Sequence, residues 1–188
     1  MTTVPLEARV EPRPPAWWGM LGLIATESAL FATLVATYFY LRAQSDTGWP
    51  PVGIDKPSVV VPVVATVVLV PSSVALVLAI RRPDEARLWI GVAIGLGLAF
   101  LALEAWAIHS ALDDVHPQTD AYGSIFYTLA GLHWVHVAAG VAIAAWALSR
   151  TWIGPTPIVA ITIAALYWHF TNAIAVALLV TLTLSPYL

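Results

Sequence analysis

Cysteine is absent from the 188-residue sequence, and charged residues make up only 10% of it. The first absence excludes disulfides, thiolate-held metal or iron–sulfur centres, a cysteine nucleophile and attachment of c-type haem. A charged fraction of 10% is far below the roughly 25% that is typical of soluble domains. With 8 Lys and Arg against 11 Asp and Glu, the net charge is -3. The chain therefore has no basic surface for nucleic acid, and we expect no such partner.

Apolar residues are in excess, at 60% of the chain with a mean hydropathy of +0.82. They form five runs, each at least about as long as the ~20 residues that span a bilayer. Helix is expected even for the valine-rich second run, because a lone strand cannot satisfy its backbone in lipid. The sequence predicts an all-α polytopic membrane protein: a cytoplasmic tail over 1–16, then one transmembrane domain over 17–188 without a separate soluble catalytic unit. Its five helices are expected at about 17–41, 58–80, 88–109, 123–148 and 158–184.

Basic residues between the runs set the expected orientation. With five spans, the tail and the connections at 81–87 and 149–157 share one side of the membrane. That side holds Arg9, Arg13, Arg81, Arg82, Arg87 and Arg150. The other side holds only two basic residues, Arg42 and Lys56. Its 110–122 loop carries Asp113, Asp114 and Asp120 and no Lys or Arg. By the positive-inside rule, we expect the N-terminus inside and the C-terminus outside.

Ionisable residues at membrane depth are costly, so they are the candidate site residues. Glu27, His136 and His169 fall near the middle of the first, fourth and fifth runs, and His133 is one turn from His136. Glu104 lies nearer the outer end of the third run. Desolvation disfavours a charged carboxylate, so we expect a neutral Glu27 unless a cation, for which the histidines are candidates, lies beside it. We interpret Glu27 as a structural acid that joins two helices, with a role as proton carrier as the alternative.

The histidines also have two interpretations. His133, His136 and His169 could hold a metal or a haem, since a b-type haem in a bundle requires two opposed histidines. The Glu-x-x-His pattern of di-iron bundles is missing from the sequence. The simpler interpretation gives each imidazole a hydrogen bond to a neighbouring helix or a lipid headgroup. We therefore expect no metal or haem in this chain.

Lipid contacts are predicted at the cytoplasmic ends of the helices. Arg81, Arg82 and Arg87 gather there, and their guanidinium groups can snorkel to lipid phosphate. Topology alone is the alternative explanation for these arginines. Trp168 is a further candidate for lipid contact, with packing inside the bundle as the alternative.

Gly91 and Gly95 form a pair of small residues one turn apart, which predicts the close approach of another helix.

Three stretches carry a family pattern. Residues 120–140, DAYGSIFYTLAGLHWVHVAAG, combine a Tyr-Gly-Ser-x-Phe start with a Gly-hydrophobic-His-x-x-His-Val core. Residues 167–170 read Tyr-Trp-His-Phe, and the first run carries a single glutamate, Glu27. Glu104 with Trp106 forms a Glu-aromatic pair. These features resemble subunit III of the haem–copper (cytochrome c) oxidases in its five-helix bacterial form. Asn172 departs from the family pattern, which usually has an aspartate there.

The resemblance implies a non-catalytic subunit of a terminal respiratory oxidase in a bacterial cell membrane, where oxygen reduction drives proton translocation. Haem and copper would belong to partner subunits. The chain would pack mainly on subunit I, with subunit II and other respiratory subunits as further partners. It would bind phospholipid in a cleft between its first two and last three helices, and it would support proton uptake. The structural or proton-related residues would be Glu27, Glu104, His133, His136 and His169.

Three alternatives stay open at this point. Within the same family, the chain could serve a quinol oxidase or a nitric oxide reductase. Outside it, a haem-binding membrane cytochrome could use the histidines, and its isolated chain would show a Soret band. A small transporter built on Glu27 should show inverted repeats or paired broken helices, and the sequence has neither.

Overall fold

The computed structural model describes residues 13–46, 48–54, 58–112, 115, 117–118, 120–154 and 157–187. Arg9, Lys56, Asp113 and Asp114, which entered the orientation argument, lie outside these residues. The described chain contains no strand, and its five long helices are each apolar enough to cross a membrane. They are α1 Pro15–Ala43, α2 Val60–Arg81, α3 Ala86–Ala111, α4 Ala121–Arg150 and α5 Ile158–Leu178. The prediction of an all-α, five-helix membrane protein is confirmed.

The helix ends follow from local chemistry. α1 begins at Pro15, where a missing N–H costs nothing because first-turn donors have no partner within the helix. α4 begins after Asp120, whose carboxylate accepts a hydrogen bond of 2.7 Å from the Gly123 N–H. Arg42 and Arg150 lie in the last turns of α1 and α4, where a positive charge complements the helix dipole.

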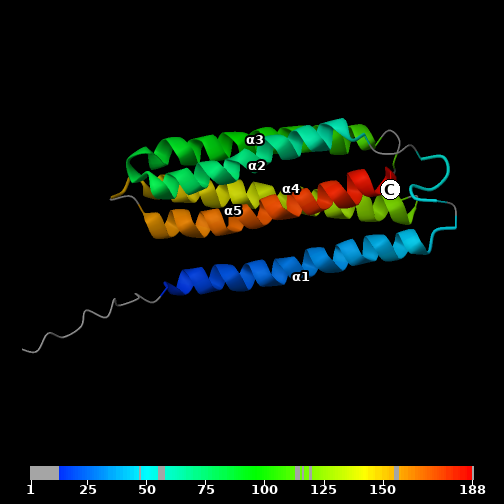
Figure 1. Ribbon diagram of the computed structural model, residues 1–188, viewed down its shortest axis with the longest axis horizontal. Coiled ribbons are helices and arrows are strands. Elements are labelled where there is room, and N and C mark those ends of the chain that lie inside the picture. Colours follow the sequence, from blue (N-terminus) through cyan, green and yellow to red (C-terminus); the bar gives the residue numbers. More distant parts are fainter. Residues whose placement is uncertain are drawn as a thin grey trace, which may run out of the picture.

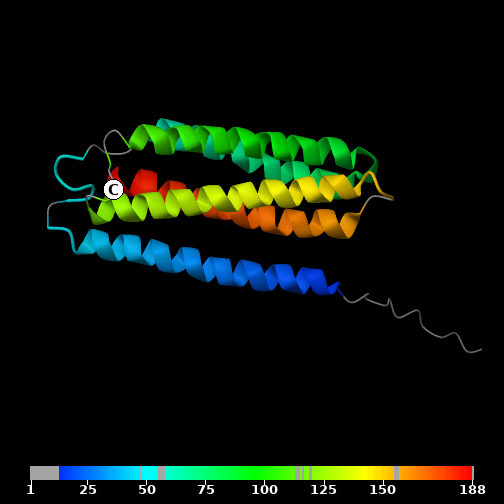
Figure 2. The ribbon, with the colours of Figure 1, turned by 180° about the vertical axis from the view of Figure 1, so that it is seen from behind.

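The helices α2, α3, α4 and α5 form an antiparallel bundle, and α1 lies along one side of it against α4 and α5 (Figure 1). The opposite view shows the same separation of α1 from α2 and α3 (Figure 2). The grouping therefore differs from the expected division into the first two and last three helices. The short turn Pro83–Glu85 forces α2 and α3 to pack as neighbours, and α2 also packs along α5. No lipid cleft separates α2 from α3.

The centre of the bundle is built around Trp168 of α5, which is 1% exposed. Its indole N–H donates a hydrogen bond of 2.6 Å to the Ser72 hydroxyl of α2. Gly97 of α3 and Gly140 of α4 make room for the ring, since a Cβ at Gly97 would lie 2.6 Å from Trp168 Cη2. The prediction that Trp168 contacts lipid is wrong, because the indole is enclosed by three other helices.

Glycine enables close packing at positions other than the expected ones. Nothing lies within 4 Å of a Cβ built at Gly91 or Gly95, so within this chain these residues do not allow another helix to approach closely. Gly97 and Gly140 do so instead, each against the ring of Trp168.

The C-terminal end of α5 departs from α-helical geometry. After Leu178 the chain continues as a π-helical turn, Leu179–Leu184, and a 3-10 turn, Ser185–Tyr187. A second apolar cluster surrounds this segment and includes Phe31 and Tyr38 of α1. At this end of the molecule, α1 is therefore tied to the bundle.

Candidate functional site

Glu27 and His136 meet at the interface between α1 and α4. Each lies near the middle of its helix, and Glu27 Oε2 is 2.9 Å from His136 Nε2. The His136 side chain is 10% exposed and that of Glu27 24%. Phe31, one turn along α1, packs edge-on against the imidazole with ring centroids 5.0 Å apart. The expectation that a histidine partners Glu27 is therefore met by His136.

The second nitrogen of His136 fixes how protons are arranged in the pair. Nδ1 lies 2.7 Å from the Leu132 carbonyl oxygen, which can only accept, so Nδ1–H must donate. Nε2 is then either the acceptor of a proton held by Glu27, or the donor from an imidazolium to a carboxylate. Both arrangements contain one proton between the two side chains and have no net charge. The geometry thus removes the cost of an isolated charge at membrane depth.

His133 points away from this pair, toward α3 and α5. Its Nε2 lies 3.2 Å from the Thr171 carbonyl oxygen, and its ring packs edge-on against Phe100 at 5.5 Å. The imidazole is buried at 2% exposure. Since the carbonyl accepts, Nε2–H donates, and this nitrogen is committed to holding α4 against α5. His133 and His136 therefore face different neighbours and do not converge on one ligand.

His169 is half-buried on α5 and has no hydrogen-bond partner among the described residues. The same part of the chain contains no group of three or more His, Cys, Asp or Glu side chains arranged to hold a metal ion. The three histidines thus occupy three separate environments.

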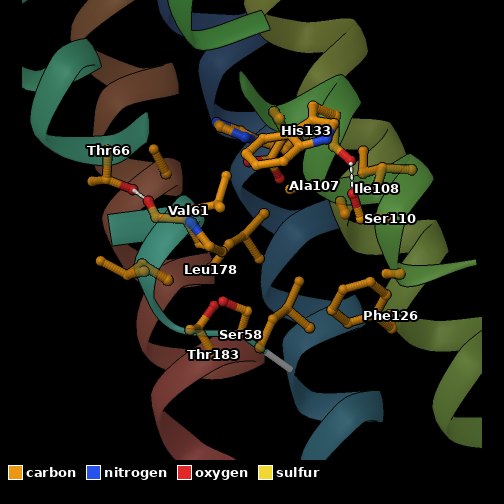
Figure 3. A pocket seen from close by; sticks show the side chains of 18 of the residues that line it. Ser58, Val61, Thr66, Ala107, Ile108, Ser110, Phe126, His133, Leu178 and Thr183 are labelled. Carbon is orange, nitrogen blue, oxygen red and sulfur yellow. Dashed lines mark hydrogen bonds between the residues drawn. The ribbon is translucent and has the colours of Figure 1, made fainter. Parts of the chain in front are cut away.

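Glu104 is also separate from the Glu27–His136 pair. It lines a cavity of about 320 Å³ inside the α2–α5 bundle, toward the end where α3 terminates and α4 begins (Figure 3). His133 lines the deep end of the same cavity. No hydrogen bond or ion pair of the described residues involves the Glu104 carboxyl group.

The three arginines at the opposite end of the molecule are exposed but differ in their contacts. Arg82 forms an ion pair of 3.4 Å with Glu85. Arg87 donates to Thr151 Oγ1 at 3.2 Å and to the Thr151 carbonyl oxygen at 2.7 Å, which ties the start of α3 to the end of α4. Arg81 has no such partner in the described residues. Arg87 thus has a structural role in addition to its charge.

The sequence did not predict a second contact that holds α1 against the bundle. The Tyr38 hydroxyl lies 3.0 Å from the Ser185 hydroxyl, and both residues are buried. Tyr167 OH also donates to the His136 carbonyl oxygen at 3.4 Å. Residues 147 positions apart, such as Tyr38 and Ser185, share no local pattern, so no signal in the sequence pointed to this contact.

Five apolar helices, with an acid–imidazole pair buried at membrane depth, define a multi-pass helical membrane protein. The sequence pattern of cytochrome c oxidase subunit III matches residues 15–185. A probable cytochrome c oxidase subunit 3 of Nocardia farcinica is 29% identical over 174 residues, 87% of this chain and 85% of that protein. One from Mycobacterium tuberculosis is 31% identical over 169 residues, 85% of this chain and 83% of that protein. A cytochrome c oxidase subunit 3 of a Bacillus species is 32% identical over 170 residues, covering 84% and 78%. The chain belongs to the cytochrome c oxidase subunit III family.

Proposed function

We propose that this chain is a non-catalytic membrane subunit of a terminal oxidase, which packs on the redox-bearing subunit I and adjoins subunit II. The observation that carries the proposal is the exposure of α1. In its most apolar stretch only 6% of the residues are buried within the chain. Leu23, Leu30 and Phe39 are among its exposed apolar side chains. A helix with so much apolar surface requires lipid or another membrane subunit around it.

Lipid binding and support of proton uptake are further parts of the proposal. Membrane lipid would cover the exposed sides of α1, next to the Glu27–His136 pair. Arg81, Arg82 and Arg87 are exposed at one end of the bundle, where they are available to lipid phosphate. Glu27, His136, Glu104, His133 and His169 are the polar groups that would act in proton transfer or hold the helices for it.

The proposed location is a bacterial cytoplasmic membrane with the N-terminus inside. The arginines of the 81–87 turn and Arg150 lie at the same end of the helices as the start of α1 (Figure 1). By the positive-inside rule, this arrangement supports a cytoplasmic location for that end of the helices.

Purified oxidase prepared with and without this chain tests the function. We expect both preparations to retain the same haem and copper per subunit I, because the redox centres are assigned to partners. The preparation lacking the chain should take up protons more slowly during oxygen consumption. Metal analysis and a visible spectrum of the isolated chain provide the complementary measurement. Stoichiometric iron or copper in that chain, with a Soret band, would contradict the proposal in favour of a membrane cytochrome.

A further inference from the structure

A second polar site lies inside the α2–α5 bundle, apart from α1 and its acid–imidazole pair. The cavity of about 320 Å³ receives polar side chains from four helical segments, including Thr66, Glu104, His133 and Thr183. Figure 3 shows Thr66, Thr183 and Ser58 on one side of the cavity, Ser110 and Phe126 on the other, and His133 at its upper end. Ser58 and Ser110 are exposed, so the cavity approaches the surface beside them.

Two polar groups at this cavity lack a protein partner. Glu104 has no hydrogen bond or ion pair in the described chain. The Tyr122 hydroxyl is also unpartnered, although the residue is 1% exposed. A carboxyl group in an apolar environment is destabilising unless a hydrogen-bond partner satisfies it. The site therefore requires a ligand that can donate and accept hydrogen bonds.

Water fits this requirement better than a lipid tail or a metal ion. The volume is well above the ~10–15 Å³ needed for one water, and polar cavities of this kind are hydrated whereas apolar ones stay dry. A lipid tail would leave Glu104 unpartnered. A metal ion would find too few ligands, because His133 Nε2 already donates to Thr171.

The π-helical turn contributes one wall of the cavity. Leu179, Leu182 and Thr183 of this turn line it, together with residues of α2, α3 and α4. π-helical turns are rare and occur frequently at functional sites, because they shift side chains relative to the α-helical path. The π-helical turn is therefore, after the two unpartnered polar groups, a second feature typical of a functional site at this cavity.

We propose that the cavity is a water-filled site in which Glu104 exchanges its proton with bulk water entering beside Ser58 and Ser110. The Glu104 carboxyl gives its proton to a cavity water, forming hydronium and a carboxylate, and recovers it by the reverse transfer. Among the described residues that line the cavity with Glu104, His133 and Tyr122 of α4 are titratable. The lining residues from α2 and α5 are apolar or carry only hydroxyl groups. The exchange is separate from the Glu27–His136 pair.

Single-cysteine labelling tests whether water enters. The chain has no cysteine, so the oxidase with the unchanged chain measures the background from the other subunits. Ala107→Cys places a thiol on the cavity wall, Ser110→Cys places one at its mouth, and Ala102→Cys places one on the exposed side of α3 away from it. A charged methanethiosulfonate reagent reacts only with a hydrated thiolate. We expect Ala107→Cys to react at least about tenfold faster than Ala102→Cys, at a rate approaching that of Ser110→Cys.

Equal, slow labelling of Ala107→Cys and Ala102→Cys would overturn the proposal. Infrared spectroscopy of the assembled oxidase gives a second test that requires no thiol. The carboxyl band that Glu104→Gln removes should change at once after a jump in bulk pH. A band that does not respond would also show that the cavity is closed to water, and the proposal would fail even if the chain acts as proposed for an oxidase subunit.

Discussion

The acid–imidazole pair at the centre of α1 and α4 holds one proton between two side chains. Because His136 Nδ1 donates to the Leu132 carbonyl, the only variable proton lies on the line between Glu27 and His136 Nε2. Movement of that proton along the line changes the charges of both groups but leaves the pair neutral. The pair can therefore fasten α1 at membrane depth in either arrangement.

Substitutions at Glu27 distinguish a structural role, in which it holds α1 against α4, from a role in proton transfer. Glu27→Gln retains a donor for Nε2, so we expect normal assembly and an unchanged midpoint of thermal unfolding. Glu27→Ala leaves Nε2 unpaired and a small void, which should cost about 1–3 kcal/mol of stability. Neither substitution should abolish electron transfer, because we propose that the redox centres lie in partner subunits. Oxygen consumption by the assembled complex is the measurement. Complete loss of turnover in Glu27→Gln with normal assembly would identify Glu27 as an obligatory proton carrier.

At the scale of the helices, the Trp168 side chain of α5 is the residue against which α2, α3 and α4 all pack. We expect Gly97→Ala to destabilise the isolated chain in detergent by about 1–3 kcal/mol, because its Cβ would clash with the rigid indole. Gly95→Ala, two residues earlier on α3, meets open space and provides the matched control. Thermal unfolding of both variants gives the comparison. Equal stability would mean that the Trp168 ring can move aside.

A substitution of Trp168 itself tests its hydrogen bond to Ser72 of α2. Trp168→Phe keeps an aromatic ring but loses the hydrogen bond to the Ser72 hydroxyl. We expect a loss of about 1 kcal/mol or somewhat more, since a smaller ring also leaves unfilled volume. Ser72→Ala should cost a comparable amount, because it leaves the buried indole N–H of Trp168 without an acceptor. An effect of Trp168→Phe no larger than that of Gly95→Ala would contradict a central role for Trp168.

The helices themselves could be predicted from the sequence, whereas their pairing could not. A run such as 123–148 differs from α4, Ala121–Arg150, by only two residues at each end, because bilayer thickness and apolar composition set its length. The neighbours of each helix depend on individual contacts, such as Gly97 with Trp168, which no local pattern contains. For the same reason the sequence indicated Glu27 and His136 as candidates, but the cavity around Glu104 became apparent only from the structure.

For the molecule as a whole, the distribution of basic residues predicts its orientation. A reporter enzyme active only outside the cytoplasm should be active when fused at residue 115 and inactive when fused at Asp84 in the α2–α3 turn. The physical reason is the excess of arginine on the side that holds Asp84. Activity at Asp84 together with inactivity at residue 115 would reverse the assigned orientation.

Lipid retention tests the arginines at that same end. Replacement of Arg81 and Arg82 by Gln should reduce the anionic lipid that copurifies with the oxidase, if these exposed guanidinium groups bind phosphate. Arg87→Gln should lower stability as well, since it also removes two hydrogen bonds to Thr151. Mass spectrometry of the bound lipid measures the first effect. Unchanged lipid in these variants would leave topology as the sole role of Arg81 and Arg82.

The position of α1 at the side of the bundle has a consequence for the order in which the protein is made and assembled. Of these five helices α1 is synthesised first, yet its side chains contact residues 109 and 147 positions further along the chain. The α2–α3 pair can form across its short turn as soon as both helices are inserted. The first helix must remain in the lipid until α4 and the end of α5 have been synthesised. Of the five helices, the one synthesised first is thus among the last to be docked, and lipid surrounds it throughout that interval.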